Sequence, residues 1–310
     1  MKELPLVSVV IPTYNRKEKL VRLVESILRS NYPKDKMEII VVDDASNDRT
    51  FERIKTKFPK VKIIRSEKEL FPAGSRNIGI KNARGDYIFL IDDDNVIDKD
   101  CISELINVIE KDFNPAIGIA APIMYYLKQP YRIWCAGIER DMTTSLTKCI
   151  GRNKTDNGQF TELIESKDFP NAFMIGRIII EKVGTLDEKS FPIHYEESDF
   201  GERVRRAGYR IVCNPKAKIW HDIPLPEEVK DRARLFHVHN EFRAYYAAKN
   251  RVIFHKKYSK WWQFLTFILV FNSLFTLYYL KVILFGSEKP LKERLKIAKS
   301  YLKGVFDGIF

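Results

Sequence analysis

Acidic side chains follow two short apolar runs in the first third of the chain. The run Tyr87–Ile91 leads directly into three aspartates, Asp92–Asp94, and the run Glu38–Val42 ends at Asp43–Asp44. Three adjacent carboxylates repel one another unless a cation lies among them. Carboxylate and phosphate oxygens are the ligands that Mg²⁺ prefers. The triple aspartate therefore predicts a metal–phosphate site, and the alternative is an exposed acidic loop before the next helix.

Two further patterns suit a phosphorylated ligand. A carboxylate at the end of a strand, such as Asp43 or Asp44, can accept a hydrogen bond from a ribose hydroxyl or a base N–H, unless it only forms a turn. The segment Pro72–Asn77 opens a predicted helix through Gly74, and its free N–H groups together with Arg76 suit an anion. The alternative for this segment is an ordinary helix start.

The elements that must position these residues alternate between strands and helices. Short β-branched runs recur about every 25 residues with amphipathic helical patterns between them, which is typical of βαβ units and a mainly parallel sheet. In such a sheet the ligand crevice lies at the carboxyl ends of the strands. The predicted strand Val7–Ile11 ends at Pro12, Thr13, Tyr14 and Asn15, so we expect polar residues to meet the aspartates there.

The C-terminal part has a different character. Trp261–Leu280 is a stretch of twenty residues without a charge, long enough to cross a bilayer, although a buried core or dimer helix is the alternative. Beyond it, Leu291, Leu295, Ala298, Leu302, Val305 and Ile309 alternate with lysines, a pattern typical of a basic helix that lies on a membrane.

The net charge of +12 is concentrated in the same part. Residues 230–310 hold 16 Lys or Arg and 5 Asp or Glu, a net charge of +11, so residues 1–229 carry only +1. This distribution favours an anionic membrane surface as the partner and gives no support to nucleic-acid binding. Four scattered cysteines with no CxxC pair indicate a reducing compartment and no disulfide framework. No secretory signal pattern opens the chain, so we expect its chemistry on the cytoplasmic face of a membrane.

Five motifs in order resemble those of family 2 glycosyltransferases. They are Val9–Arg16 (VVIPTYNR), Val41–Ser46 (VVDDAS), Ala73–Gly79 (AGSRNIG), Gly85–Asp94 (GDYIFLIDDD) and Glu196–Tyr209 (EESDFGERVRRAGY). The resemblance covers about residues 5–255. It implies an α/β GT-A fold, Rossmann-like with a mainly parallel sheet. It also implies an inverting transfer from a nucleotide-diphosphate sugar, as in rhamnosyltransferases and related surface-glycan transferases.

The resemblance also assigns residues to the donor. The base and ribose would rest against Pro12, Thr13, Tyr14, Asn15 and Asp44, with Asp43 close by. The DxD motif maps to Asp92 and Asp94, of which Asp94 would bind Mg²⁺ or Mn²⁺, with Asp92 also a candidate metal ligand. Asp93 or Asp92 would contact the ribose. His221 follows a strand-like segment and is a candidate metal or phosphate ligand.

The fifth motif implies the general base that deprotonates the acceptor hydroxyl. The family usually has Glu-Asp at the key pair, whereas this chain has Glu196-Glu197. We therefore rank Glu197 first and Asp199 second, with Glu196 beside them. The alternative is that these acids are surface residues opposite Arg203, Arg205 and Arg206.

Together these patterns predict a hexosyltransferase with two parts. Residues 1–255 would form the catalytic domain, with 1–125 binding the nucleotide sugar and 126–255 the acceptor, and residues 256–310 would associate with the membrane as a monotopic or single-span segment. The acceptor would be lipid-linked or a polysaccharide. The alternatives are a polyprenyl-phosphate sugar synthase or a catalytically silent sugar-nucleotide or glycan-binding protein. A homo-oligomer is possible in either case.

Overall fold

The computed structural model describes residues 3–111 and 113–310, which form two compact units. Unit 1 consists of Met1–Glu139, Cys149–Glu188 and Phe200–Ile223, and unit 2 of Arg140–Lys148, Lys189–Asp199 and Pro224–Phe310. These units are defined by packing, whereas the predicted boundary at residue 255 divides the chain by function. That boundary therefore stays a prediction.

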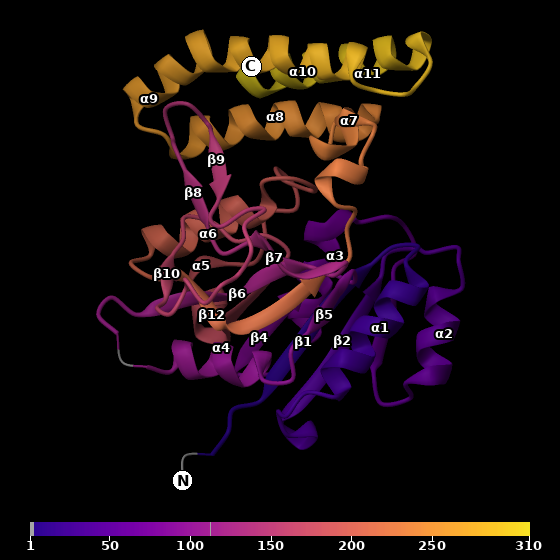
Figure 1. The fold of residues 1–310 in the computed structure, drawn as a ribbon, viewed down its shortest axis with the longest axis vertical. Helices are drawn as coiled ribbons and strands as arrows, with labels where there is room; N and C mark the ends of the chain where they lie inside the picture. Colours follow the sequence, from indigo (N-terminus) through magenta and orange to yellow (C-terminus); the bar gives the residue numbers. More distant parts are fainter. Residues whose placement is uncertain (1–2, 112) are drawn as a thin grey trace. The chain divides into compact units, whose positions relative to one another are not determined.

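Unit 1 is built on a mixed sheet whose N-terminal half is parallel (Figure 1). Strands β1 (Val7–Thr13), β2 (Met37–Asp43), β3 (Lys62–Arg65) and β4 (Tyr87–Ile91) lie in the order β4-β1-β2-β3, with every neighbouring pair parallel. Thr13 is in register with Asp43 at the ends of β1 and β2. The polar residues after these strands therefore share one edge of the sheet, as the sequence predicts.

The other half of the sheet starts at β11 (Ala172–Gly176), which is antiparallel to β4 and to β6 (Ile117–Tyr126). Strand β12 (Arg210–His221) runs parallel to β6 and brings His221 to its end. Shorter strands complete the arrangement: β5 (Asn95–Ile97), β7 (Gln129–Cys135) and β10 (Ile164–Glu165) in the same sheet, and the separate pair β8 (Ile138–Arg140) and β9 (Thr147–Cys149).

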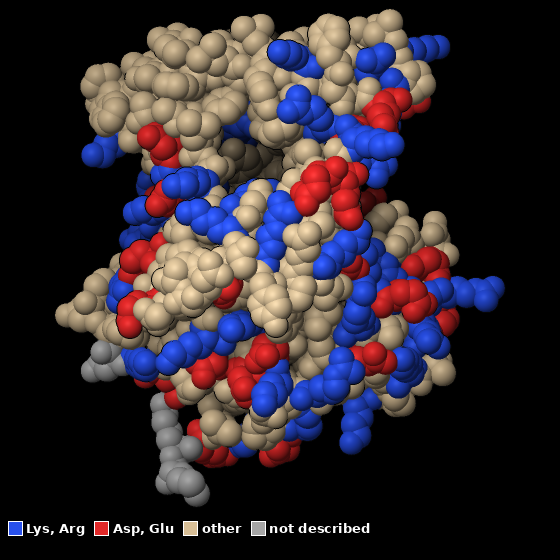
Figure 2. Space-filling model, viewed as in Figure 1, with Lys and Arg blue, Asp and Glu red and all other residues tan. Residues whose placement is uncertain are grey.

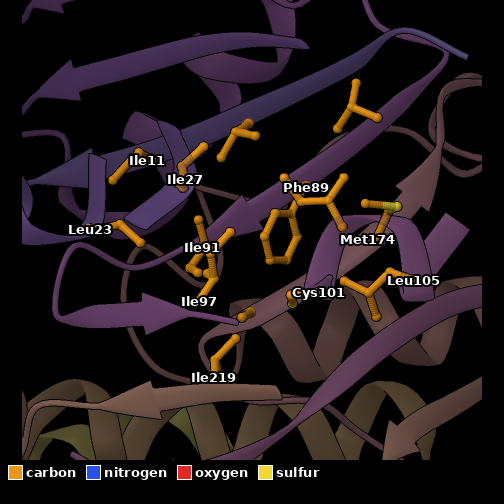
Figure 3. Close-up of a cluster of buried hydrophobic side chains, with 14 of the residues drawn as sticks. Ile11, Leu23, Ile27, Phe89, Ile91, Ile97, Cys101, Leu105, Met174 and Ile219 are labelled. Atoms are coloured by element: carbon orange, nitrogen blue, oxygen red, sulfur yellow. The ribbon is translucent and has the colours of Figure 1, made fainter. Parts of the chain in front are cut away.

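Two apolar layers cover the two faces of this sheet because successive strand residues point to opposite sides. Val9, Ile11 and Phe89 pack with α1 (Lys17–Leu28) and α4 (Cys101–Ile109). Figure 3 shows this layer, with Ile11, Leu23 and Ile27 at one side and Cys101, Leu105 and Met174 at the other. On the opposite face, Val10, Ile88 and Leu90 pack with residues of α3 (Phe71–Asn82), α5 (Arg177–Val183) and α6 (Glu196–Arg206).

Two helices begin later than the sequence suggests. We expect a helix from Ser46 or Asn47, but α2 spans Thr50–Lys57, because Asp43 accepts a hydrogen bond from the Ser46 N–H and Asp48 accepts one from the Thr50 N–H. The sequence also predicts that Asp98 caps a helix over Lys99–Glu110, but α4 begins at Cys101 and the Asp98 carboxylate accepts from the N–H of Asp100, which stands directly before the helix. In both places an aspartate forms a local turn instead of a helix cap.

The C-terminal part of unit 2 is helical. It contains α7 (Arg232–Leu235), α8 (Glu241–Tyr258), α9 (Trp261–Thr266), a π-helical segment η3 (Phe267–Phe271), α10 (Asn272–Phe285) and α11 (Leu291–Ile309). Helix α11 packs along α8 at glycines: a Cβ added at Gly304 would lie 2.2 Å from the carbonyl oxygen of Tyr245. The two backbones therefore approach more closely than a side chain at position 304 would permit.

Helix α11 has three faces rather than the two that its sequence predicts. Ile297, Ala298 and Tyr301 are buried in a cluster with α8 and α10. Leu291, Leu295, Leu302 and Phe306 form a second, apolar face that is about half exposed. Lys292, Lys296, Lys299 and Lys303 are exposed beside it. We call the second face the exposed apolar stripe of α11.

Candidate active site

Two loops at the carboxyl ends of β1 and β2 are tied together. The Asn15 N–H donates to Ser46 Oγ (2.9 Å), and Asn15 Oδ1 accepts from the Asn47 N–H (2.8 Å). Asn15 and Ala45 both adopt left-handed backbone conformations, with φ of 52° and 61°. Such conformations cost free energy outside glycine and concentrate at functional sites. Tyr14, directly before Asn15, is 45% exposed, so its ring is available to a ligand.

Asp43 and Asp44 differ in what their carboxylates do. Asp44 accepts hydrogen bonds from the N–H groups of Leu70 (2.7 Å) and Phe71 (2.9 Å), so it holds the entrance to α3. Burial raises the pKa of Asp44, although these N–H groups oppose the shift. Asp43 is fully buried and accepts from the Ser46 N–H through Oδ1, while its Oδ2 makes no hydrogen bond and lies 3.9 Å from Arg65 Nε.

Asp93 and Thr13 link the ends of β4 and β1. Thr13 Oγ1 donates to Asp93 Oδ2 (2.7 Å), and Arg16 Nη1 donates to Asp93 Oδ1 (3.1 Å). Asp93 is 3% exposed, and burial raises its pKa to about 7 against the opposing charge of Arg16. Asp93 therefore faces into the protein and braces the loop that carries its neighbours.

Asp94 has the features of a metal ligand. Its Oδ2 accepts from Arg16 Nη1 (2.7 Å), and its buried Oδ1 has no hydrogen-bond partner and lies 3.2 Å from His221 Nε2. Burial would raise the pKa of Asp94, but His221 and Arg16 outweigh it and lower the pKa to about 2. A carboxylate oxygen beside an imidazole nitrogen at this spacing fits two neighbouring ligands of one divalent ion.

Asp92 is oriented by α3. Arg76 is 2% exposed and donates through Nη2 to Asp92 Oδ1 (2.6 Å), so the predicted anion-binding arginine contacts the DxD motif. Gly74 lies in the same first part of α3. Within the described residues, no three His, Cys, Asp or Glu side chains gather as a metal site. Asp94 and His221 are two neighbouring side chains that could hold a metal ion together with phosphate oxygens or water.

The predicted base residues occupy the first turn of α6, within unit 2. Asp199 is fully buried and accepts from Lys257 Nζ and Tyr258 Oη, each at 2.6 Å. Glu196 is buried and Glu197 is half-buried. Directly before them, His194 and Tyr195 both have left-handed backbones, with φ of 61° and 66°. The buried Asn250 holds this turn by donating to the carbonyl oxygens of Ile193 and His194.

Three residues that contact the predicted site residues escape the sequence patterns. Arg16 belongs to the first motif, and a search for a cation to balance the three aspartates could have identified it. The resemblance places Asn171–Ile175 in an acceptor pocket, and in the structure Asn171 Oδ1 accepts a hydrogen bond from Asn95 Nδ2 (2.6 Å). Lys257 and Tyr258 bind Asp199 from the far end of α8, and no local pattern could connect residues so distant in the sequence.

Comparison with known proteins identifies the family. The sequence profile described as glycosyl transferase family 2 matches residues 8–176, more than half of the chain. A probable glycosyltransferase of Bacillus subtilis, YdaM, is 28% identical over 76% of this chain, and a dolichol-phosphate mannosyltransferase of Pyrococcus furiosus is 32% identical over 74%. The chain spans 54% and 57% of the lengths of these two relatives.

A solved structure shares the fold. The mannosyltransferase PcManGT of Pyrobaculum calidifontis, in complex with GDP-Man and Mn²⁺, aligns with 100% of this chain and 88% of its own, with a TM-score of 0.61 and 14% identity. The predicted GT-A fold is thereby confirmed. Together with the profile match, the five ordered motifs lead to one conclusion: the chain belongs to the family 2 glycosyltransferases.

Proposed function

We propose that this chain transfers a sugar, with inversion, from a nucleotide-diphosphate donor to a lipid-linked or polysaccharide acceptor, using Mg²⁺ or Mn²⁺. One observation carries the proposal: the buried Asp94 Oδ1 lies 3.2 Å from His221 Nε2 without a hydrogen-bond partner. A bound divalent ion would neutralise the charge that grows on the leaving diphosphate. The Mn²⁺ in the PcManGT structure agrees with this assignment.

The nucleoside would lie against the ends of β1 and β2. The exposed Tyr14 ring offers a stacking surface, and Asp43 Oδ2 offers an acceptor for a base N–H. Asp44 contributes indirectly, because its carboxylate holds the backbone before α3. Asp92 is oriented by Arg76 and would accept from a ribose hydroxyl, while the buried Asp93 fixes the loop.

Glu197 is the proposed general base, because the alternative, Asp199, has a structural task. Asp199 is fully buried and its Oδ1 accepts two hydrogen bonds from α8, which would have to break before it took a proton. Glu197 lies two residues before Asp199 and is only half-buried, so its carboxylate retains access to solvent. Asp199 then anchors the first turn of α6 and so positions Glu197, with Glu196 buried beside it.

We further propose that unit 2 binds an anionic membrane. Trp261–Phe285 is, among the described residues, the one helix long and apolar enough to cross a bilayer, and only 22% of its most apolar window is buried. The exposed apolar stripe of α11 and its lysines lie in the same helical layer. Figure 2 shows a broad tan surface at the α9 end of this layer, with Lys and Arg gathered toward the other end. This combination suits insertion into one leaflet.

A polyprenyl-phosphate sugar synthase is the second candidate. The relative from Pyrococcus furiosus is named as a dolichol-phosphate mannosyltransferase, and the apolar helices of unit 2 would suit a lipid acceptor. A catalytically silent binding protein would share the donor site but would give no turnover.

The test is a thermal-shift panel of UDP-, GDP- and dTDP-sugars with and without Mn²⁺. We expect one nucleotide to raise the melting temperature of the wild type only when Mn²⁺ is present. Asp94→Asn should abolish that shift, whereas Asp35→Asn, which alters an exposed aspartate elsewhere in unit 1, should keep it. No response of the wild type to any donor would refute the proposed function.

A further inference from the structure

A group of basic side chains surrounds the turn that precedes α6, all of it within unit 2. The His194 and His237 ring centroids are 5.7 Å apart, and His239 and Arg243 also act electrostatically on His194. Burial, followed by His237, Arg243, His239 and Arg251, lowers the pKa of His194 well below its usual value. His194 is thus neutral in a strongly positive environment.

Two features of unit 2 contribute positive charge around His194. His239 stands just before Asn240, which caps the N-terminus of the 18-residue helix α8, where the helix dipole is positive. On the other side, the Arg251 guanidinium lies over the rings of Phe275 and Tyr279 and donates to the Tyr301 hydroxyl (3.3 Å). Arg251 and Arg140 even lower the pKa of Tyr195, although burial would raise it.

Two imidazole nitrogens in this group are buried without a hydrogen-bond partner: His194 Nε2 and His239 Nδ1. Both rings remain partly exposed, and His237 is exposed. Asp231 is the acidic group that acts on His239, and it also accepts from the Ala233 N–H. Buried polar atoms are normally satisfied, so these nitrogens suit a ligand that brings acceptor oxygens.

The backbone holds this group in a costly conformation. His194, Tyr195 and His237 all have left-handed φ values, of 61°, 66° and 55°. The side chain of the buried Asn250 holds the first of these turns through the carbonyl oxygens of Ile193 and His194. Strained backbone that a buried side chain enforces is typical of a ligand-binding segment.

We propose that His194, His237, His239 and Arg243 form a phosphate-binding subsite directly before the predicted base Glu197. A phosphate group supplies several acceptor oxygens and negative charge, which matches the imidazole and guanidinium donors. The proposal rests on the proposed function, since the phosphate would belong to a substrate of the transfer. Two substrates carry one: a prenyl phosphate acceptor and the nucleotide-diphosphate donor.

The test measures binding by calorimetry on the full chain in detergent micelles. The probes are a short prenyl phosphate, the matching prenol, and UDP and GDP in the presence of Mn²⁺. We expect wild type to bind the prenyl phosphate at least tenfold more tightly than the prenol. The variants are His194→Gln, Arg243→Gln and the exposed His237→Gln, with Arg232→Gln as a control for loss of an exposed charge in the same unit. Melting temperatures identify any variant that fails to fold.

Each result decides the proposal. A tenfold or greater loss of prenyl phosphate affinity in the variants, with nucleotide affinity unchanged, assigns the subsite to the acceptor. A loss of nucleotide affinity instead assigns it to the donor diphosphate. If His237→Gln and Arg243→Gln fold and bind every probe like wild type, the subsite does not exist. A wild type that binds prenyl phosphate but no nucleotide would refute the proposed function and leave the subsite standing.

Discussion

His221 Nε2 lies 3.2 Å from Asp94 Oδ1, although His221 ends β12 and Asp94 lies in the loop between β4 and β5, far away in the sequence. The register of β12 against β5 produces this contact, because it pairs His221 with Asn95, the residue after Asp94. Trp134 packs edge-on against the imidazole, with ring centroids 4.7 Å apart, and fixes its orientation. The sheet therefore brings an imidazole nitrogen and a carboxylate oxygen together, and we propose that they bind one ion.

His221→Gln should weaken Mn²⁺ binding in the presence of the nucleotide on the order of tenfold, because one nitrogen ligand is lost while Asp94 remains. Manganese titration followed by calorimetry measures the change. The variant His255→Gln provides the control, since it removes a histidine of unit 2 that belongs neither to the proposed metal site nor to the proposed phosphate subsite. Unchanged Mn²⁺ affinity in His221→Gln would show that His221 is not a metal ligand.

Glu197→Gln should lower turnover roughly a hundredfold or more, because the amide cannot accept the proton of the acceptor hydroxyl. Donor affinity and melting temperature should stay near the wild-type values. Initial rates of sugar transfer, or of donor hydrolysis, measure the loss. Nearly full turnover of Glu197→Gln would show that another group is the general base.

Asp199→Asn should act mainly on stability. The amide leaves Lys257 and Tyr258 with a weaker partner at a fully buried position, at a cost of about 1–3 kcal/mol. We expect a lower melting temperature and only a moderate fall in turnover. If Asp199→Asn instead lost turnover as completely as Glu197→Gln while keeping wild-type stability, Asp199 would be the base.

His255 should make the stability of unit 2 depend on pH. Burial, followed by the charges of Arg140 and Arg251, lowers the pKa of His255 to about 3, and the ring stacks on Phe267. The unfolded chain, with a pKa near 6.5, therefore binds more protons between pH 6.5 and 3. The contribution of His255 to the free energy of unfolding is therefore fully present above pH 6.5. Below that pH it falls by about 1.4 kcal/mol per pH unit. Chemical denaturation should show that His255→Gln loses less free energy of unfolding than the wild type between pH 7 and 4. The same pH dependence in both proteins would contradict this account.

Gly304→Ala should separate α11 from α8. The new methyl group would lie 2.2 Å from the backbone oxygen of Tyr245, which cannot move like a side chain, so we expect a loss of at least about 1–3 kcal/mol. Gly176→Ala is the matched control, because the nearest atom there is 3.7 Å away. Equal melting temperatures for the two variants would show that α11 does not pack on α8.

The order of elements in unit 1 and the polar edge of its sheet follow from the sequence, because β-branched runs and amphipathic helices alternate there. The sequence could not predict which carboxylate oxygens already accept hydrogen bonds from the protein. Asp44 looks equivalent to Asp43, yet its oxygens are engaged by Leu70 and Phe71, an outcome fixed by a loop conformation. Likewise, the sequence of α11 predicts only an apolar and a basic face. Its third face is buried because its glycines let the backbone of α8 come close, and the sequence of α11 alone does not show that α8 packs there.

The most direct test of the central claim counts bound Mn²⁺ by electron paramagnetic resonance, in the presence of the nucleotide diphosphate that stabilises the wild type. The account predicts one tightly bound ion in wild type and in Asp35→Asn, and none in Asp94→Asn under the same conditions. A full equivalent of tightly bound Mn²⁺ in a folded Asp94→Asn protein would contradict the account.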